Sequence, residues 1–275
     1  MLALSKKIMN KCNIMMFAAG FGTRLRPFTN STPKPALPLN QIPLGYFALP
    51  YLDCVQSENF VVNTFHLPKK IHALYEQISD KIIFSDEVDF IKGSGGGLKE
   101  AEDFFDLAVP ILALNADEIF FTENYAFLAE ALAAHQQKNN LATLIVTEHP
   151  GAGTKFGAIW CIDETVVHIG KDQPLSHPQA KPWHFIGLQF LSPEILKSIN
   201  AKMEKNIFYD ILIHELKNTK IQIHPIKCDW YEVGNIEDYK IAKTEINEQL
   251  KINLTYKNHF KLLEKYPKSQ LSDLA

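Results

Sequence analysis

Hydrophobic positions along the chain follow two alternating patterns, one typical of buried strands and one typical of amphipathic helices. Short continuous apolar runs predict strands at residues 14–19, 60–65, 81–85, 109–115 and 141–147. Between them, apolar residues at helical spacing predict helices at residues 44–56, 68–78, 97–105 and 124–137. This alternation predicts an α/β fold, Rossmann-like and doubly wound, with a mixed, mainly parallel sheet covered by helices on both faces.

The pattern changes after Pro150. Shorter strand-like segments follow at residues 157–162, 165–169 and 185–191, and then a helix that Ser192 caps and Pro193 begins. A charged helix is predicted from residue 235 to about residue 250, and the loss of periodicity beyond it predicts a mobile tail. We therefore divide the chain into an N-terminal extension (residues 1–12), one main domain (residues 13–245) and a C-terminal helical tail (residues 246–275).

Composition and charge exclude several classes of function. The 275 residues are 46% apolar and 21% charged, which is typical of a folded globular protein. The net charge of −3 and the lack of a dense Lys/Arg block argue against a nucleic acid or an anionic membrane as partner. The apolar runs are much shorter than the roughly 20 residues that span a bilayer, and no signal-peptide pattern is found, so we expect a cytoplasmic location.

Cysteine and histidine spacing does not predict a structural metal site. Cys12, Cys54, Cys161 and Cys228 lie far apart and form no CxxC pair, which favours reduced, packed thiols over a disulfide framework or a zinc knuckle. The ten histidines include no HExxH motif.

A glycine turn directly after the first predicted strand carries the strongest chemical signal. Gly20 and Gly22 stand where small residues let backbone N–H groups approach phosphate oxygens at the carboxyl end of a parallel sheet. The third glycine of a dinucleotide fingerprint and the Gly-Lys-Ser/Thr of a Walker loop are both absent. Arg24, Arg26 and Lys34 add cations that could neutralise a triphosphate, although a solvated basic turn would give the same pattern.

The motif GxGTRxRPxTxxTPKP at residues 20–35 resembles the N-terminal signature of the sugar-1-phosphate nucleotidyltransferases. The resemblance implies the nucleotide-diphospho-sugar transferase type of fold, with a nucleoside triphosphate and a sugar-1-phosphate as the bound partners. It implies that Arg24 and Lys34 are the catalytic cations and that the nucleotide-binding residues include Ala18, Gly20, Gly22, Thr23 and Arg24. Weaker similarity extends to about residue 245 and is strongest to short members that act on N-acetylmuramic acid 1-phosphate, mannose 1-phosphate or heptose 1-phosphate.

Two acidic positions are candidates for holding Mg²⁺, which prefers oxygen ligands and usually takes one or two carboxylates together with substrate phosphates. Asp117 follows the strand predicted at residues 109–115, where a carboxylate would face the ligand crevice; taken alone, the pattern favours an ordinary turn or helix-cap residue. Glu232 lies in the sequence WYEVGN, which resembles the family segment W-x-D-x-G-T with glutamate in place of aspartate. By this resemblance, we expect Mg²⁺ as cofactor at Asp117 and Glu232.

Further positions follow from the resemblance alone. The glycine run at residues 93–97 resembles the family segment that lies against the nucleobase, which implies nucleotide contacts at Gly95 and Gly96. Gly157, Lys171 and Gly187 stand at positions that imply contacts to the sugar phosphate. Without the resemblance, the glycine run is equally well a flexible helix-start loop, and a lone lysine such as Lys171 is more often a solvated loop residue.

The primary hypothesis is therefore an Mg²⁺-dependent enzyme that joins a nucleoside triphosphate and a sugar-1-phosphate and releases pyrophosphate. One alternative is cytidylyl transfer to phosphocholine, for which a similar glycine loop serves. Another is a catalytically weakened protein that binds nucleotide sugars in a regulatory role, suggested by Glu232 and by Ala116 in place of a family glycine. The sequence leaves both a monomer and a homo-oligomer open.

Overall fold

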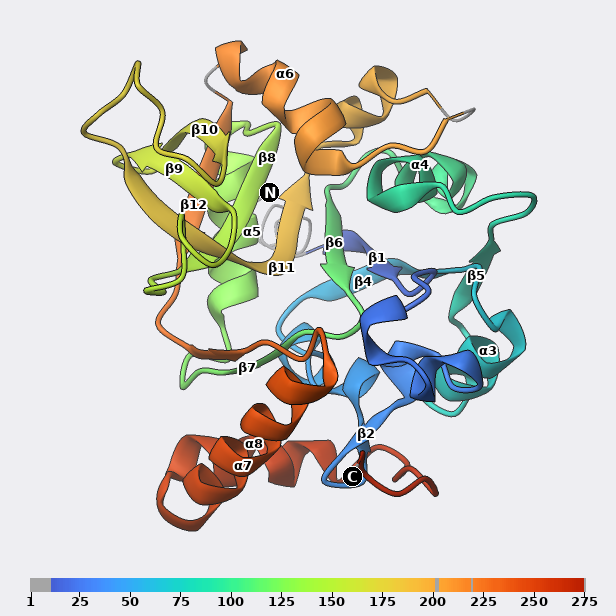
Figure 1. Cartoon of the computed structure of the whole chain (residues 1–275). Coiled ribbons are helices and arrows are strands. Elements are labelled where there is room, and N and C mark those ends of the chain that lie inside the picture. Colours follow the sequence, from blue (N-terminus) through green and yellow to red (C-terminus); the bar gives the residue numbers. More distant parts are fainter. Residues whose placement is uncertain (1–10, 201–202, 219, 275) are drawn as a thin grey trace, which may run out of the picture.

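A central nine-stranded sheet organises the protein (Figure 1). The computed structural model describes residues 11–200, 203–218 and 220–274. The strands follow the order β5 (Ile83–Asp86), β4 (Gln56–Thr64), β1 (Lys11–Phe17), β6 (Ile111–Asn115), β11 (Lys181–Leu191), β8 (Ala142–Thr147), β12 (Ile221–Pro225), β10 (Thr165–Gly170) and β9 (Ala158–Ile162). The predicted α/β fold with a mixed sheet is confirmed.

Strand direction changes across the sheet at β11. The strands β5, β4, β1 and β6 are parallel, whereas β11 is antiparallel to both β6 and β8. The first residues of β11, Lys181 to Trp183, also pair with β9, so the second half of the sheet curls back on itself. The carboxyl ends of the parallel strands and the start of β11 therefore meet at one edge, where α/β proteins bind ligands.

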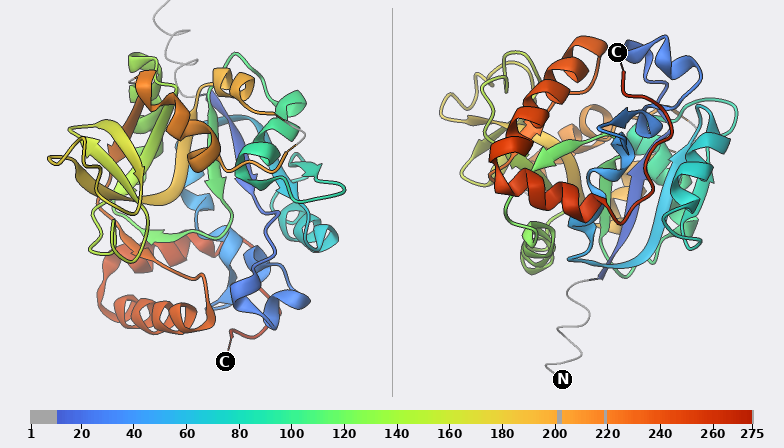
Figure 2. Two further views of the ribbon diagram at one scale, coloured as in Figure 1. Left: turned by 45° about the horizontal axis from the view of Figure 1, so that its top comes forward. Right: turned by 90° about the horizontal axis from the view of Figure 1, so that it is seen from below.

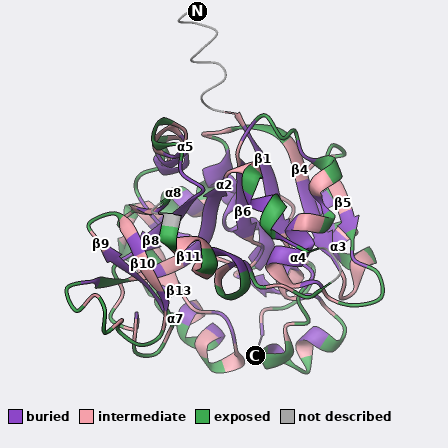
Figure 3. Cartoon of the chain, turned by 90° about the horizontal axis from the view of Figure 1, so that it is seen from above, coloured by how far each residue is buried: buried purple, intermediate pink, exposed green. Residues whose placement is uncertain are grey.

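Alternate residues of each central strand face two separate cores. Ile14 and Met16 of β1 pack on one side of the sheet, while Met15 between them packs on the other. The first core also receives residues from α2 (Leu49–Leu52), α3 (Pro68–Glu76), α5 (Phe127–Lys138), α7 (Ile236–Ile252) and α8 (Leu254–Leu263). The second receives residues from α4 (Gly93–Glu100) and a π-helix at Ile207–Leu212, which leads into α6 (Ile213–Glu215). Figure 3 shows the resulting buried strands inside a more exposed periphery.

Several predicted helices differ from those in the structure. The helix predicted at residues 44–56 is wrong: the segment contains a 3₁₀ turn at Leu44–Tyr46 and the four-residue α2, and β4 begins at Gln56. Gly45 and Pro50 lie inside the predicted helix, and both residues disfavour a long helix. The helix predicted to start at Gly97 starts at Gly93 instead. The predicted cap at Ser192 is confirmed, but the helix after it is a 3₁₀ helix, Pro193–Ser198.

The C-terminal segment is docked on the protein, so the prediction of a mobile tail is wrong for its described part. The Asp273 carboxylate accepts hydrogen bonds from the backbone N–H groups of Asn40 (3.0 Å) and Gln41 (3.1 Å). These two residues form the turn between β2 (Pro38–Leu39) and β3 (Ile42–Pro43), and Figure 2 shows the red tail beside this blue segment. Leu274 is buried. Part of this segment is the helix α8 (Leu254–Leu263), and the residues after α8 pack through a few specific contacts rather than as a helix.

The boundaries of the predicted segments fall inside regular elements. Lys11 and Cys12 belong to β1, and residues 1–10 of the predicted extension lie outside the described residues. The boundary at residues 245 and 246 falls within α7. All four cysteines are free thiols. No helix in the described part of the chain is long and apolar enough to cross a membrane.

Candidate active site

The glycine turn that follows β1 forms one wall of a cavity of about 270 Å³. Gly22 has a φ of +60°, and a Cβ at this position would lie 2.9 Å from Cγ2 of Thr29, so the turn requires glycine here. The Thr29 hydroxyl donates a hydrogen bond to the Gly22 carbonyl (2.9 Å) and fixes the turn. Beyond its chain neighbours, no atom lies within 4 Å of the place that a Cβ on Gly20 would take, so the Gly20 backbone borders open space.

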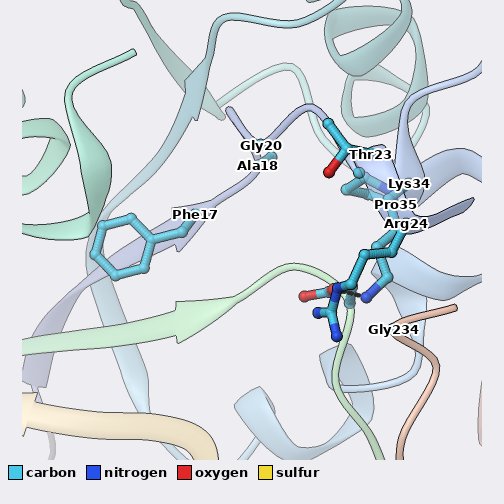
Figure 4. A pocket seen from close by; sticks show the side chains of 10 residues that line it. Phe17, Ala18, Gly20, Thr23, Arg24, Lys34, Pro35 and Gly234 are labelled. Atoms are coloured by element: carbon cyan, nitrogen blue, oxygen red, sulfur yellow. Dashed lines mark ion pairs between the residues drawn. The ribbon is translucent and has the colours of Figure 1, made fainter. Parts of the chain in front are cut away.

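Both predicted catalytic cations line this cavity (Figure 4). Arg24 lies in a 3₁₀ turn, Thr23–Leu25, and Lys34 begins another, Lys34–Ala36. Lys34 forms an ion pair with Asp117, which holds its ammonium group at the cavity wall. The structure brings together Ala18, Gly20, Gly22, Thr23, Arg24 and Lys34 around one cavity, and their contact with a nucleotide stays a prediction.

A two-stranded ribbon carries both predicted metal ligands. In this ribbon β7 (Ile119–Phe121) is antiparallel to β13 (Asp229–Tyr231), and Ile119 is paired with Tyr231. Asp117 precedes β7 and Glu232 follows β13, so both carboxylates lie at the same end of the ribbon. Asp117 lines the cavity directly. Glu232 and Arg24 both border Gly234, another lining residue, and a Cβ there would overlap the Glu232 carboxylate.

The donor set in this cavity fits Mg²⁺ only with help from substrate. Within the described residues, no group of three or more His, Cys, Asp or Glu side chains could hold a metal ion. Asp117 and Glu232 supply two carboxylates, which matches a Mg²⁺ site completed by phosphate oxygens and water rather than an all-protein cage.

A second cavity of about 210 Å³ shares Phe17, Gly20 and Asp117 with the first and extends over β4 and α4. Asn63, Gly93 and Ser94 line its far side. The buried Asn63 side chain accepts a hydrogen bond from the Ala18 N–H (2.8 Å) and donates one to Glu87 (2.7 Å). Glu87 in turn accepts one from the Lys92 N–H (2.7 Å). This network ties the glycine turn to the start of α4.

Burial raises the pKa of the Glu87 carboxyl, and the hydrogen bonds from the Lys92 N–H and the Asn63 amide oppose the rise. A buried carboxylate is stable only with such donors. Asn63 and Glu87 are residues that the sequence analysis did not identify, because neither belongs to a recognisable motif. The position of Asn63 near the end of a predicted strand was the available signal.

Gly95 and Gly96 line neither cavity. Their N–H groups point at the Lys205 carbonyl, with distances of 2.8 and 3.4 Å. A Cβ at Gly95 would lie 2.5 Å from Cδ1 of Ile211, and one at Gly96 would lie 2.9 Å from Cβ of Lys92. Gly95 and Gly96 therefore let the 203–211 segment pack closely on α4, whereas Gly93 and Ser94 at the start of the run border the second cavity.

The three positions predicted for the sugar phosphate lie on other elements. Gly187, with a φ of +84°, is in β11, and a Cβ there would overlap the Glu118 side chain. Gly157 precedes β9, where a Cβ would lie 3.2 Å from the Tyr209 hydroxyl. Lys171 is exposed just beyond β10 and does not line the first cavity. Contact of these residues with a sugar phosphate stays a prediction.

Glu118, next to Asp117, is the most perturbed acid near the cavity. Its carboxylate accepts hydrogen bonds from the Asn115 amide (2.8 Å) and from the Trp230 indole N–H (2.9 Å). Burial raises the pKa of Glu118 to about 7, with a further contribution from the Asp117 charge, against the effect of these two hydrogen bonds. No sequence motif distinguishes Glu118 from its neighbour Asp117, so no role was predicted for it.

An aromatic cluster surrounds Trp230. The ring of His184 lies 4.1 Å from that of Trp230, and the rings of Phe156 and His149 lie 5.5 and 5.7 Å from it. His184 is 6% exposed, and within the described part of the chain neither of its ring nitrogens has a hydrogen-bond partner. Burial lowers the pKa of His184 to about 4, so the ring is neutral at neutral pH.

The chain is similar in sequence to known transferases over most of its length. A UTP–glucose-1-phosphate uridylyltransferase from Synechocystis sp. is 26% identical over 242 residues, which cover 82% of this chain and 61% of that protein. A mannose-1-phosphate guanyltransferase from Schizosaccharomyces pombe is 29% identical over 246 residues, with coverage of 82% and 61%. The chain thus spans about 61% of the length of these curated relatives.

The fold is also similar to that of a UDP-glucose pyrophosphorylase of known structure. The structure of a UDP-glucose pyrophosphorylase complexed with UDP-glucose superposes with a TM-score of 0.70 at 21% identity, over 86% of this chain and 99% of that one. The Nucleotidyl transferase family matches residues 13–249, a range that includes the glycine turn, both cations and both acids. This match confirms the resemblance carried by residues 20–35. The chain belongs to the nucleotidyl transferase family.

Proposed function

We propose that the protein is an Mg²⁺-dependent sugar-1-phosphate nucleotidyltransferase. The observation that carries the proposal is the first cavity, in which a glycine turn, two cations and a carboxylate meet at the carboxyl ends of parallel strands. The names of the two curated relatives, a glucose-1-phosphate uridylyltransferase and a mannose-1-phosphate guanyltransferase, support the same reaction class.

The chemistry needs no nucleophile from the protein. A phosphate oxygen of the sugar-1-phosphate attacks the α-phosphorus of the nucleoside triphosphate, the bond from the α-phosphorus to its bridging oxygen breaks, and pyrophosphate leaves with the electron pair. The anionic reactants repel each other, so catalysis depends on positioning and on charge neutralisation. Arg24 and Lys34 supply fixed positive charge to the phosphates from two separate turns of the cavity wall.

Asp117 and Glu232 are the residues that would hold Mg²⁺ in this site. When bound, the ion would neutralise phosphate oxygens and help to align the attacking and leaving groups. Glu232 replaces the family aspartate, and its longer side chain folds back beside Gly234 and Arg24. The nucleoside would occupy the second cavity, bordered by Asn63, Gly93 and Ser94.

A substrate grid tests this proposal. Purified protein is assayed for pyrophosphate release with Mg²⁺, four nucleoside triphosphates and a panel of sugar-1-phosphates plus phosphocholine, and each reaction is repeated with EDTA. The proposal predicts release with at least one sugar-1-phosphate, and loss of release with EDTA. Release only with CTP and phosphocholine would contradict it. The proposal would also be contradicted if no reaction released pyrophosphate while nucleotide sugars raised the melting temperature, because this result would identify a binding protein.

A further inference from the structure

The ribbon of β7 and β13, which places Asp117 and Glu232, is a separate element of the fold. Its two strands have three residues each and form a two-stranded sheet apart from the nine-stranded one. Two short strands alone are marginally stable in water and need to pack against a further element. The position of the two carboxylates at the first cavity therefore depends on what packs against the ribbon.

The helix α8 packs on one face of this ribbon (Figure 1). Tyr256, in the first turn of α8, is fully buried, and its ring stacks on that of Phe121 in β7 with the centroids 4.0 Å apart. The rings of His259 and Phe260, one turn later, lie 5.2 and 6.2 Å from that of Phe121. Because α8 begins beyond residues 13–249, the range that the family matches, membership of the family does not account for this packing.

The Tyr256 hydroxyl bonds to both ends of β13. An ionised carboxylate only accepts hydrogen bonds, so Tyr256 donates one to Asp229 (2.9 Å). A hydroxyl carries one proton, so the Tyr231 hydroxyl is the donor in its second hydrogen bond with Tyr256 (2.7 Å). Asp229 and Tyr231 are the first and last residues of β13, and Glu232 follows directly. One buried side chain therefore contacts β7 through its ring and β13 through its hydroxyl.

We propose that α8 holds the ribbon in place and that Tyr256 is a positioning residue for the carboxylates of Asp117 and Glu232. The proposal rests on the proposed function, and it names the residue that fixes the acidic side of that site. Tyr256 does not line the first cavity. It acts through the pairing of Phe121 with Asp229 and of Ile119 with Tyr231, which sets where the two acids emerge from the ribbon.

Hydrogen exchange tests the support of the ribbon without any ligand. Amide exchange is measured by mass spectrometry for the wild type and for Tyr256→Phe, which keeps the aromatic ring but removes the hydroxyl. The matched control is Tyr46→Phe, because Tyr46 is also buried and its hydroxyl donates to the Leu74 carbonyl of α3 (2.6 Å) rather than to the ribbon. Tyr256→Phe should speed exchange of the β7 and β13 amides by about 10-fold, and Tyr46→Phe should leave these amides unchanged.

Titration calorimetry tests whether this support serves the site. The affinities of UDP-glucose and GDP-mannose are measured with Mg²⁺ and with EDTA, and the wild type should bind at least one of them more tightly with Mg²⁺. Tyr256→Phe should weaken that binding in Mg²⁺ by about 10-fold, the lower end of the effect of a group that orients a metal ligand, and change the affinity in EDTA by less than about 2-fold. Asp229→Asn keeps an acceptor for the Tyr256 hydroxyl without the charge, so its affinity in Mg²⁺ should lie between those of the wild type and Tyr256→Phe. Tyr46→Phe should bind as the wild type does.

Three results would overturn the proposal. The first is exchange of the ribbon amides in Tyr256→Phe that is no faster than in Tyr46→Phe. The second is faster exchange with an unchanged affinity in Mg²⁺, which would show that α8 supports the fold alone. The third is a wild type that binds neither nucleotide sugar more tightly with Mg²⁺ than with EDTA. Only the third also contradicts the proposed function, so the two failures are distinguishable.

Discussion

Asn63 links the two segments that enclose the proposed nucleotide, so replacing it should affect stability and nucleotide affinity together. Asn63→Ala leaves the Ala18 N–H without its acceptor and removes one of the donors to Glu87. An unpaired buried N–H costs about 1–3 kcal/mol, and a lost hydrogen bond to a charged group costs about 1.5–3 kcal/mol. The sum is about 2.5–6 kcal/mol, which at about 2–4 °C for each kcal/mol in a large domain lowers the melting temperature by roughly 5–24 °C.

A matched control separates the two effects. Asn63 lies in β4 beside the carboxyl end of β1, whereas Asn13 lies near the start of β1 and is also buried. The Asn13 side chain likewise bonds to backbone groups: it donates to the Asp106 carbonyl (2.8 Å) and accepts from the Asp106 N–H (3.0 Å). Asn13→Ala should therefore cost a similar free energy of unfolding, but it is remote from both cavities.

Thermal unfolding and steady-state kinetics of both variants, measured well below their melting temperatures, provide the assay. We expect Asn63→Ala to raise KM for the nucleoside triphosphate by about 10-fold, equivalent to about 1.4 kcal/mol, and Asn13→Ala to leave it unchanged. Equal kinetics in the two variants would refute the argument, since it would show that the hydrogen bonds of Asn63 support the fold but do not position the glycine turn. An unchanged melting temperature for Asn63→Ala would refute the energetic estimate.

Three other perturbations have defined outcomes. Lys34→Ala should lower kcat by about 10²- to 10³-fold with little change in melting temperature. Lys11→Ala, at the far end of β1, should leave kcat unchanged. A near-normal rate for Lys34→Ala would contradict its assignment as a catalytic cation. Gly187→Ala should lower the melting temperature because of its positive φ and its overlap with Glu118, whereas Gly20→Ala, which meets no atom within 4 Å, should not; equal shifts would contradict the packing argument. Burial lowers the pKa of each histidine in the set His135, His184 and His259 to about 4. As the pH falls, these histidines are protonated in the unfolded chain before they are protonated in the folded protein. Their contribution to the free energy of unfolding should be fully present above about pH 6.5. Between pH 6.5 and 4, the free energy of unfolding should fall by up to about 1.4 kcal/mol per histidine for each pH unit. Denaturant unfolding at several pH values checks this, and a His259→Gln variant with an unchanged slope would contradict it.

The central strands of the sheet could be predicted because they are buried along almost their whole length. Residues 109–115 and 141–147 were predicted as strands, and β6 and β8 occupy Ile111–Asn115 and Ala142–Thr147. Such strands are buried on both faces and appear as short apolar runs. The ribbon of β7 and β13 was not predicted, because each strand has three residues and its partner lies more than 100 positions away in the sequence. Pairing at that separation leaves no local signal.

The site residues likewise fall into those that a local sequence pattern predicted and those that it did not. Gly20, Arg24 and Lys34 lie within 15 consecutive positions, so a single motif identified residues that the structure places around one cavity. Asp117 could be proposed from its place after a buried strand, whereas Glu232 could be proposed only through resemblance; the ribbon explains why both lie at the same end of two paired strands. Asn63, Glu87 and Glu118 act through contacts between distant segments, and no spacing in the sequence indicates such contacts. Gly95 and Gly96 show the opposite case, since a glycine run that suggests ligand contact serves close packing of the chain on itself.

We propose that the cavity around Arg24, Lys34 and Asp117 directs attack at the α-phosphorus of a nucleoside triphosphate. The most direct measurement follows a phosphorus label placed either on the α-phosphate or on the γ-phosphate, in the presence of Mg²⁺ and the productive sugar-1-phosphate. We expect the α-label to appear in a nucleotide sugar and the γ-label in pyrophosphate. Transfer of the γ-label to the sugar phosphate, or its release as inorganic phosphate, would contradict it.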